Sequence, residues 1–488
     1  MRLTNATMYA RVLAGDASYN GRFFTGVLTT GIYCLPSCKA RKPKPENVRF
    51  FPTCEAARAA GLRACRKCHP DDFARGADPV LESIETLVEE VRADPASFAD
   101  TTSMVRRSGF GTTRVFELCR EYFHRTPAEL LLRARLEKSK AVLLDSTAGI
   151  ADVAAEAGFE SLSVFHEHFR RVTGLTPTAY RGLNQTGRFQ MLLPEGYLLP
   201  YLRRALGRDP QSCTEQLTGD VYRTVVALNQ GPALLRLQLA PDVIDAEIID
   251  YKTPSRSVAA ATARSAGIEA HGVVAGMLGL DQDAAAFARL ARKLGLHRLV
   301  AARTELRISQ TPSIFDGLLW SIIGQQINLS FARVLKRRLI ERTSRPFADG
   351  LYAPPTPAAV AALDPGELLP LQFSRQKADY VISTARLVTG GKLDLASLPN
   401  LSAARAERTL LAVRGLGPWS VNYLLMRSLG FPDCVPLGDT GVTSGLQALL
   451  KLEERPDVDA TRRLMAMFAP CRSLATAHLW QFNQPVPL

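Results

Sequence analysis

The sequence predicts a multidomain α+β protein. A small cysteine-rich module, an all-α helical pair, an antiparallel-sheet α+β domain and a final all-α domain are expected to follow one another along the chain. The length of 488 residues exceeds what one hydrophobic core usually organises and predicts about three or four domains. Cysteines gather near the N-terminus, and a helical segment later repeats itself. Strand-like alternation follows the repeat, and helical periodicity then continues to the C-terminus.

The charge of the chain favours a polyanionic partner. The formal net charge is +13, and residues 1–75 alone carry 13 Lys and Arg against 5 Asp and Glu. Nucleic acid is the commonest such partner, so a phosphate-facing surface is expected near the N-terminus. No run approaches the roughly 18 apolar residues of a membrane span, and the first 30 residues lack the layout of a signal peptide. We therefore expect a cytoplasmic, nucleoid-associated protein with no membrane partner, whose cysteines bind metal, react or pack rather than form disulfides.

Four cysteines within a predicted first domain, residues 1–76, have the spacing of a metal site. Three residues separate Cys34 from Cys38, 26 residues follow, and two residues separate Cys65 from Cys68. Two short loops with this spacing can offer four thiolates to one tetrahedral Zn²⁺ ion. Because four cysteines close the coordination shell, a purely structural zinc site is one interpretation, and a reactive zinc-bound thiolate is the other.

The residues around these cysteines resemble a known repair domain. Residues 29–41, 46–48 and 64–70 closely resemble the N-terminal domain of the Ada methyl-phosphotriester repair proteins. The resemblance implies that Cys34, the first cysteine of the quartet, accepts a methyl group from a DNA phosphotriester. A zinc-bound thiolate is a nucleophile suited to that transfer. The expected phosphate contacts, each of which could instead be a solvated surface charge, are Lys39, Arg41, Lys42 and Lys44.

Residues 79–182 contain an internal repeat of a helical unit. The Gly-Phe pair at 109–110 recurs at 158–159, and the Thr-Pro pair at 126–127 recurs at 176–177. Residues 151–171 are expected to form a helix, a glycine turn and a second helix capped by Ser161 and anchored by Phe165 and Phe169. They resemble the AraC-type DNA-binding domain, which implies that the two units read a promoter operator in the major groove. The residues implied in this reading are Thr112, Arg114, Ser161, Ser163 and His166. A helical pair without a role in DNA binding is the alternative.

Residues 185–282 are expected to form the antiparallel-sheet α+β domain, with one helix near residues 198–206. Alternating apolar residues predict strands at 189–193, 221–228, 233–239 and 244–249. Beyond about residue 283 the pattern is helical to the end, with proline-rich and glycine-rich turns. Residues 283–488 are therefore expected to form one all-α domain.

Segment 413–423 is expected to be a glycine-rich hairpin between two helices. Its glycines let the backbone approach a phosphate closely, and the N–H groups at the start of the next helix can bind that anion. Together with segments 323–327, 352–357 and 472–480, it resembles the helix-hairpin-helix of the AlkA-type 3-methyladenine DNA glycosylases. The resemblance implies contacts with double-stranded DNA by Gln325, Gln326, Gly415 and Gly417.

Asp439 occupies the position that matches the catalytic carboxylate of this family. An N-alkylated purine is a good leaving group, so one carboxylate beside the sugar, with water as nucleophile, suffices for excision. Lyase-competent relatives carry a lysine where this chain has Trp419, so a monofunctional glycosylase that leaves an abasic site is expected. Trp419 and Tyr423, four residues apart, are expected to line the base pocket or, alternatively, to be core packing.

Two residues depart from the family pattern. Cys471 stands where the family has a pocket tryptophan, and Gln326 stands at the wedge position, where an apolar residue can occur. The resemblances together imply a monomeric protein in which methyl transfer to Cys34 activates transcription with RNA polymerase, while Asp439 excises alkylated bases. The departure at Cys471 motivates the alternative of a DNA-binding regulator whose glycosylase half is catalytically degenerate.

Overall fold

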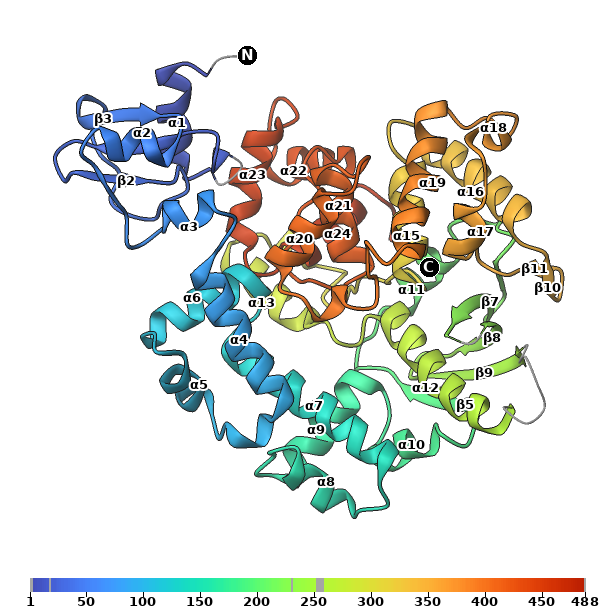
Figure 1. Ribbon diagram of the computed structural model, residues 1–488. Coiled ribbons are helices and arrows are strands. Elements are labelled where there is room, and N and C mark those ends of the chain that lie inside the picture. The colour runs from blue at the N-terminus through green and yellow to red at the C-terminus, as the bar shows by residue number, and fades with distance from the viewer. Residues whose placement is uncertain (1–2, 17–18, 230, 252–258, 487–488) are drawn as a thin grey trace. The chain divides into compact units, whose positions relative to one another are not determined.

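The chain forms two compact units, Met1–Leu87 and Val88–Leu488. The computed structural model describes residues 3–16, 19–229, 231–251 and 259–486 (Figure 1). The predicted multidomain α+β class is confirmed, because small sheets are embedded in a mostly helical chain. Among the helices of the described residues, none has both the length and the apolar character that crossing a lipid bilayer requires.

The first unit contains a four-stranded sheet in the order β3-β1-β2-β4. The first strand ends at Val27, because the residues after it form the turn into the next strand. Phe24, Tyr33 and Phe51 are buried in its core. The elements are α1 (Asn5–Ala14), β1 (Phe24–Val27), β2 (Ile32–Cys34), β3 (Val48–Phe51), α2 (Cys54–Ala59), β4 (Arg63–Ala64) and α3 (Pro70–Ala74).

The expected helical repeat is present after α4 (Pro79–Ala93). In each copy, a glycine in the left-handed conformation separates two helices: Gly109 has φ 71° and Gly158 has φ 88°. Thr126 and Thr176 each cap the helix that follows, with proline at its start. The elements are α5 (Thr101–Ser108), α6 (Thr112–Phe123), α7 (Pro127–Asp145), α8 (Ile150–Glu156), α9 (Leu162–Thr173) and α10 (Pro177–Gly182).

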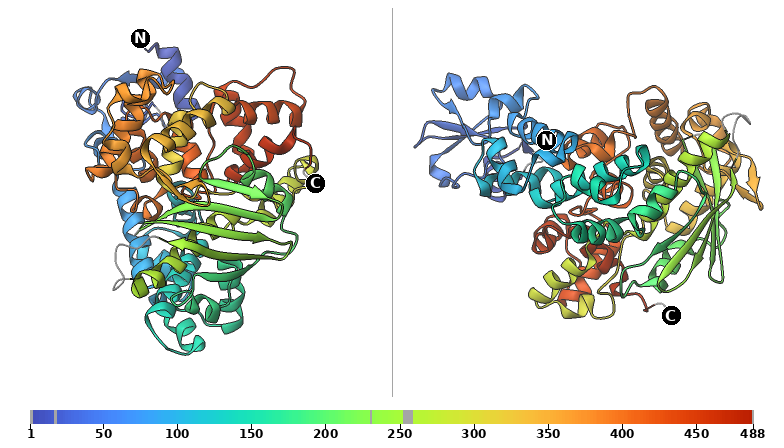
Figure 2. Two further views of the ribbon diagram at one scale, coloured as in Figure 1. Left: turned by 90° about the vertical axis from the view of Figure 1, so that its right-hand side faces the viewer. Right: turned by 90° about the horizontal axis from the view of Figure 1, so that it is seen from below.

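A five-stranded antiparallel sheet follows, in the order β5-β9-β8-β7-β6, and Figure 2 shows its strands side by side. The four predicted strands and the predicted helix are all found: β5 (Arg188–Leu192), α11 (Leu199–Leu206), β7 (Val221–Leu228), β8 (Gly231–Leu239) and β9 (Val243–Tyr251). Strand β6 (Glu215–Thr218) and helix α12 (Ala259–Leu278) were not anticipated. β6 is a short, polar edge strand, so it lacks the apolar alternation that signals a strand.

The second helical repeat and the sheet share one hydrophobic core. Phe169, on α9, and Phe189, on β5, belong to the same buried cluster. Between them lies His271 of α12, whose Nε2 is 2.7 Å from the carbonyl oxygen of Thr173 and whose ring packs edge-on against Tyr180. Burial lowers the pKa of His271 to about 4, so this imidazole is neutral at pH 7. The segments before and after residues 182–185 therefore pack as one body.

The remaining chain packs around a second large core that includes Phe287, Leu318 and Leu424. The expectation of helices alone beyond residue 283 is wrong at one hairpin, where Asp349 and Gly350 both adopt the left-handed conformation that a tight two-residue turn requires. The elements are α13 (Ala284–Lys293), α14 (His297–Val300), α15 (Ile314–Ile323), α16 (Leu329–Thr343), β10 (Pro346–Ala348), β11 (Leu351–Tyr352), α17 (Pro357–Ala361), α18 (Pro365–Leu368), α19 (Arg375–Thr389), α20 (Ala403–Leu411), α21 (Pro418–Arg427), α22 (Thr440–Leu450), α23 (Val458–Met465) and α24 (Arg472–Phe482).

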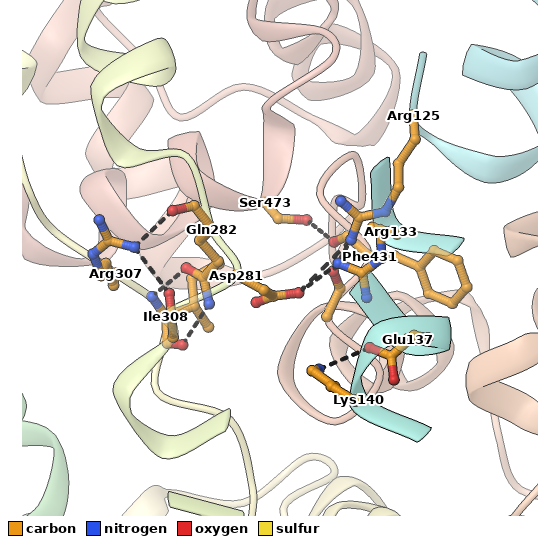
Figure 3. Close-up of polar contacts among 12 residues, drawn as sticks. Arg125, Arg133, Glu137, Lys140, Asp281, Gln282, Arg307, Ile308, Phe431 and Ser473 are labelled. Atoms are coloured by element: carbon orange, nitrogen blue, oxygen red, sulfur yellow. Dashed lines mark hydrogen bonds and ion pairs between the residues drawn. The ribbon is translucent and has the colours of Figure 1, made fainter. Parts of the chain in front are cut away.

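The first helical repeat is docked on this helical body through an ion-pair cluster. Figure 3 shows the Asp281 carboxylate facing two arginines: its Oδ2 lies 3.0 Å from Arg133 Nη1 and 3.9 Å from Arg125 Nη2. Although burial opposes ionisation, the two guanidinium groups lower the pKa of Asp281. Arg125 also donates to the carbonyl oxygen of Gly430 at 3.4 Å, and the adjacent His124 ring packs edge-on against Phe431. The turn between α6 and α7 is thus anchored to the loop that follows α21.

Candidate functional sites

The register of the first sheet brings the four predicted metal ligands together. β4 runs parallel to β2 with Ala64 opposite Tyr33, so Cys65 emerges beside Cys34. One ligand atom from each cysteine of the quartet lies within 4.8 Å of the other three. Four sulfurs at such distances fit a tetrahedral ion with Zn–S bonds of about 2.3 Å. This donor set confirms the expectation of a zinc site.

Backbone amides around the quartet are oriented toward its sulfurs. Leu35 N donates to Cys68 Sγ at 3.3 Å, and Lys67 N donates to Cys65 Sγ at 3.4 Å. Such N–H groups stabilise thiolates. Cys34 is buried with 8% of its surface exposed. His69, which adjoins the second cysteine pair, lies outside the quartet and its Nδ1 is 3.4 Å from a carboxylate oxygen of Asp72.

Basic side chains surround the zinc site. Lys42 uses its ammonium group within the protein, since Nζ donates to the carbonyl oxygen of Cys38 at 2.8 Å. Arg66 and Lys67, which are exposed between the second pair of ligands, were missed although their place within the cysteine motif was a visible signal. The other predicted phosphate contacts are exposed: Lys39, Arg41 and Lys44, the last within 4.0 Å of Glu46.

The predicted reading residues of the helical pair lie on accessible positions. Phe165 and Phe169 are fully buried, which leaves the intervening face of α9 in solvent. Ser161 caps this helix as expected, since its side chain accepts from Val164 N at 3.4 Å. Arg114 is half-buried and pairs with Glu117 at 3.2 Å. The fully accessible members of the predicted set are Thr112, Ser161, Ser163 and His166.

A cavity of about 1510 Å³ lies where the five-stranded sheet meets α11, α15, α16 and α21. It brings together every residue that the sequence predicted for the helical domain. These residues line the cavity from three stretches of chain: Gln325, Gln326, Gly415, Gly417, Trp419, Tyr423 and Asp439.

Asp439 is held at this cavity by three hydrogen-bond donors. It caps α22, and its Oδ1 accepts from Val442 N at 3.0 Å. The indole Nε1 of Trp419 donates to Oδ2 at 3.1 Å, and the indole Nε1 of Trp480 donates to Oδ1 at 2.8 Å. Because an indole N–H can only donate, both carboxylate oxygens act as acceptors here, and these contacts fix the orientation of the carboxylate. Trp480 was not predicted as a site residue, although it is one of only three tryptophans in the chain.

The aromatic residues form one wall of the cavity. The rings of Trp419 and Tyr423 stack with centroids 5.4 Å apart and an interplanar angle of 19°, and Trp480 lies 6.3 Å beyond Tyr423. Cys471, by contrast, is not among the described residues that line the cavity. Its neighbour Arg472 binds Asp433 through two contacts of 2.7 Å and so clamps the loop that leads to Asp439.

The hairpin before α21 is supported from inside the protein. Gly415 has φ 95°, and a Cβ atom there would come within 2.5 Å of the Tyr380 ring, so glycine is required. Gln325 donates to the carbonyl oxygen of Gly415 at 2.8 Å and to Ser420 Oγ at 3.1 Å. Gln326 is exposed at the rim with a left-handed φ of 55°. Gly417 has open space around it, which leaves room for a ligand at the start of α21.

Three parts of the chain match known families. Residues 7–71 match the metal binding domain of Ada. Residues 104–182 match a helix-turn-helix domain. Residues 319–471 match the HhH-GPD superfamily of base excision DNA repair proteins.

Relatives combine the same parts. The chain is 28% identical to a probable bifunctional transcriptional activator/DNA repair enzyme AlkA of Mycobacterium tuberculosis, over 97% of this chain and 95% of that protein. It is 28% identical to a DNA-3-methyladenine glycosylase of Bacillus subtilis, over 57% of this chain and 90% of that protein. It shares the fold of a 3-methyladenine DNA-glycosylase from Archaeoglobus fulgidus, with a TM-score of 0.50 and 20% identity over 61% of this chain and 98% of that one. The chain is therefore a fusion of an Ada-type metal-binding and helix-turn-helix regulator with an AlkA-type DNA glycosylase of the HhH-GPD superfamily.

Proposed function

We propose that this chain is a bifunctional protein of DNA alkylation damage, which repairs methylphosphotriesters at Cys34 and excises 3-methyladenine-type bases at Asp439. The observation that carries the proposal is the carboxylate of Asp439, which two indole N–H groups orient at the cavity beside the hairpin. The proposal also assigns the protein an activator role with RNA polymerase, a monomeric state and action on the DNA of the cytoplasm.

In the proposed excision, the damaged nucleotide leaves the duplex and its base enters the cavity. The N-glycosyl bond breaks with its electron pair going to the base, which departs as a neutral alkylpurine. The Asp439 carboxylate stabilises the positive charge that develops on the sugar, and water adds to the sugar carbon with loss of a proton. Trp419 and Tyr423 offer aromatic faces to a cationic base. Because tryptophan cannot form a Schiff base, the product is an abasic site.

In the proposed methyl transfer, Cys34 Sγ attacks the methyl carbon of the phosphotriester. An S–C bond forms while the O–C bond breaks, and the phosphodiester leaves as an anion. Zinc, when bound, keeps the sulfur in the thiolate form that reacts. The product is a thioether, so one negative charge is lost beside the DNA phosphates. Removal of this charge strengthens DNA binding by about 1 kcal/mol per close phosphate at water-like dielectric, and more where water is excluded.

The proposal divides DNA contacts between three surfaces. Lys39, Arg41 and Lys44 serve the phosphates at the methyl-acceptor site, and Lys42 adds its positive charge there while its ammonium group also donates to the Cys38 carbonyl oxygen. The operator is read by the accessible faces of α6 and α9. At the glycosylase site, Gly415 and Gly417 offer backbone N–H groups to a phosphate, while Gln325 supports the hairpin and Gln326 lies at the rim.

The geometry favours an active glycosylase over a degenerate one. The departure at Cys471 was the motive for the alternative, and Cys471 is absent from the described lining of the cavity, whereas Trp480 is part of it. Retention of Asp439 with both indole donors supports catalysis further.

The test incubates the full-length protein with methylated duplex DNA. The expected result is a gain of about 14 mass units, one methylene, on Cys34, together with release of free alkylpurine. Asp439→Asn should abolish base release and leave methylation intact, and Cys34→Ser should do the reverse. Cys54→Ser, at a buried cysteine outside the quartet, is the matched control and should retain both activities. A wild-type protein that neither gains the methyl group nor releases base would refute the proposal.

A further inference from the structure

The deeper part of the cavity holds charged side chains that the excision chemistry does not use. Trp419, Tyr423 and Arg427 lie four residues apart along α21, and all three line the cavity. Successive turns of a helix rise by about 5.4 Å, so Arg427 lies one turn beyond the aromatic wall. Lys336 and Asp316 also line this part, and they satisfy each other in an ion pair of 2.6 Å.

Arg427 differs from this pair because one N–H of its guanidinium group has no partner among the described residues. Only 7% of its surface is exposed, and its Nε has no hydrogen-bond partner among the described residues. No carboxylate of those residues forms an ion pair with it either. A buried N–H without an acceptor destabilises the protein, and more so when the group is charged. A ligand that brings an acceptor atom to Arg427 would remove that destabilisation.

The flipped base is the ligand that this cavity is proposed to receive. Guanine presents O6 as an acceptor at the position where adenine presents its N6 amino group, a donor. Guanidinium groups bind guanine O6 through directed N–H donors, and they cannot accept from an amino group. The aromatic wall of Trp419 and Tyr423 does not make this distinction, because every purine has a π face.

We infer that Arg427 reads the base inside the cavity by donating to a purine O6, so that the glycosylase favours alkylated guanine over alkylated adenine. This inference rests on the proposed excision activity and adds a specificity to it. Tyr423 lies one helical turn before Arg427 on α21, so the aromatic wall and the reading group are carried by the same helix.

The experiment uses one duplex DNA treated with dimethyl sulfate, which contains both N7-methylguanine and N3-methyladenine. Both lesions carry one positive charge, so a change in the net charge of the cavity alters the release rates of both bases in the same direction. The measured quantity is the ratio of the initial rates at which full-length protein releases the two bases. Arg427→Met should lower the guanine-to-adenine ratio by about tenfold or more. Arg208→Met, at an exposed arginine that also lines the cavity, is the matched control and should keep the wild-type ratio.

Each outcome has a separate meaning. An unchanged ratio in Arg427→Met, or an equal change in Arg208→Met, would overturn the inference. Equal losses of both bases in a variant with the wild-type melting temperature would also overturn it, since Arg427 would then act on excision in general. If Arg427→Met does not fold, Arg427→Lys is tested in its place. The guanine-to-adenine ratio should fall in this variant, because an ammonium group lacks the planar fork of donors. An unchanged ratio in Arg427→Lys would overturn the inference. A wild-type protein that releases neither base would instead refute the proposed excision.

Discussion

Replacement of Trp480 by phenylalanine tests whether the indole N–H groups are needed to hold the proposed catalytic carboxylate. The substitution keeps an aromatic ring on α24 but removes the donor that lies 2.8 Å from Asp439 Oδ1. Trp419 and the backbone of Val442 still donate to the carboxylate, so Asp439 keeps two of its three donors. The variant is therefore expected to fold and to remain active at a lower rate.

The expected loss follows from the strength of one hydrogen bond to a charged group. Such a bond contributes about 1.5–3 kcal/mol, and about 1.4 kcal/mol corresponds to a tenfold change in rate. If the bond is fully expressed in the transition state, Trp480→Phe should lower the excision rate by about 10- to 100-fold. Trp419→Phe should cause a loss of the same order.

The assay is single-turnover release of alkylpurine from methylated duplex DNA, which isolates the chemical step from product release. Trp320→Phe is the matched control, because Trp320 also lines the cavity and is not among the donors to Asp439. A Trp480→Phe rate within twofold of the wild type would refute the assigned role. An equal loss in Trp320→Phe would attribute the effect to general packing of the cavity.

Three further predictions concern stability and metal binding. Burial lowers the pKa of His271 from 6.5 to about 4, so between these pH values the unfolded chain binds more protons than the folded one. The free energy of unfolding should therefore fall by up to about 3 kcal/mol as the pH drops from 6.5 to 4. Urea titrations should show a weaker pH dependence of this free energy in His271→Leu. Asp281→Ala removes the carboxylate that pairs with two arginines, and it should lower the free energy of unfolding by about 2 kcal/mol, between the values for exposed and buried ion pairs. Asp245→Ala, at an ion pair with an exposed arginine, should lower it by less than about 1 kcal/mol in the same titrations. Cys38→Ala should abolish stoichiometric zinc in metal analysis of the purified protein, while Cys54→Ala should retain it.

Local patterns predicted the fold where residues contact others close in sequence. The repeat was visible because its left-handed glycines and capping threonines recur as a set, and the strands of the large sheet were visible because one face of each is apolar. Helix α12 was missed because its alanine-rich sequence has no marked polar face, so its apolar residues carry little periodic signal. The shared core around His271 was also not predictable, since it joins α9, α12 and β5 across nearly 100 residues.

The candidate site, like the fold, was predictable only where a local sequence motif marks the residue. Motif positions pointed to Asp439 and Trp419, and the structure brings their side chains to 3.1 Å. Trp480 reaches the same carboxylate only because α24 packs against α22, and Arg427 is significant only because its surroundings lack a counter-ion. Both facts depend on tertiary packing. Gln325 shows the converse, because a polar residue in a DNA-binding motif directs its amide to the protein backbone.

The contacts of the α6–α7 turn connect the helical repeat to the loop that precedes Asp439. Arg125 holds the Gly430 carbonyl, and Arg472 clamps the same loop through Asp433, six residues before Asp439. The loop therefore has one anchor on the helix-turn-helix side and another on the glycosylase side. Movement of α6 relative to this loop would break the contacts of Arg125 and His124, whereas Arg472 would still hold the loop to α24.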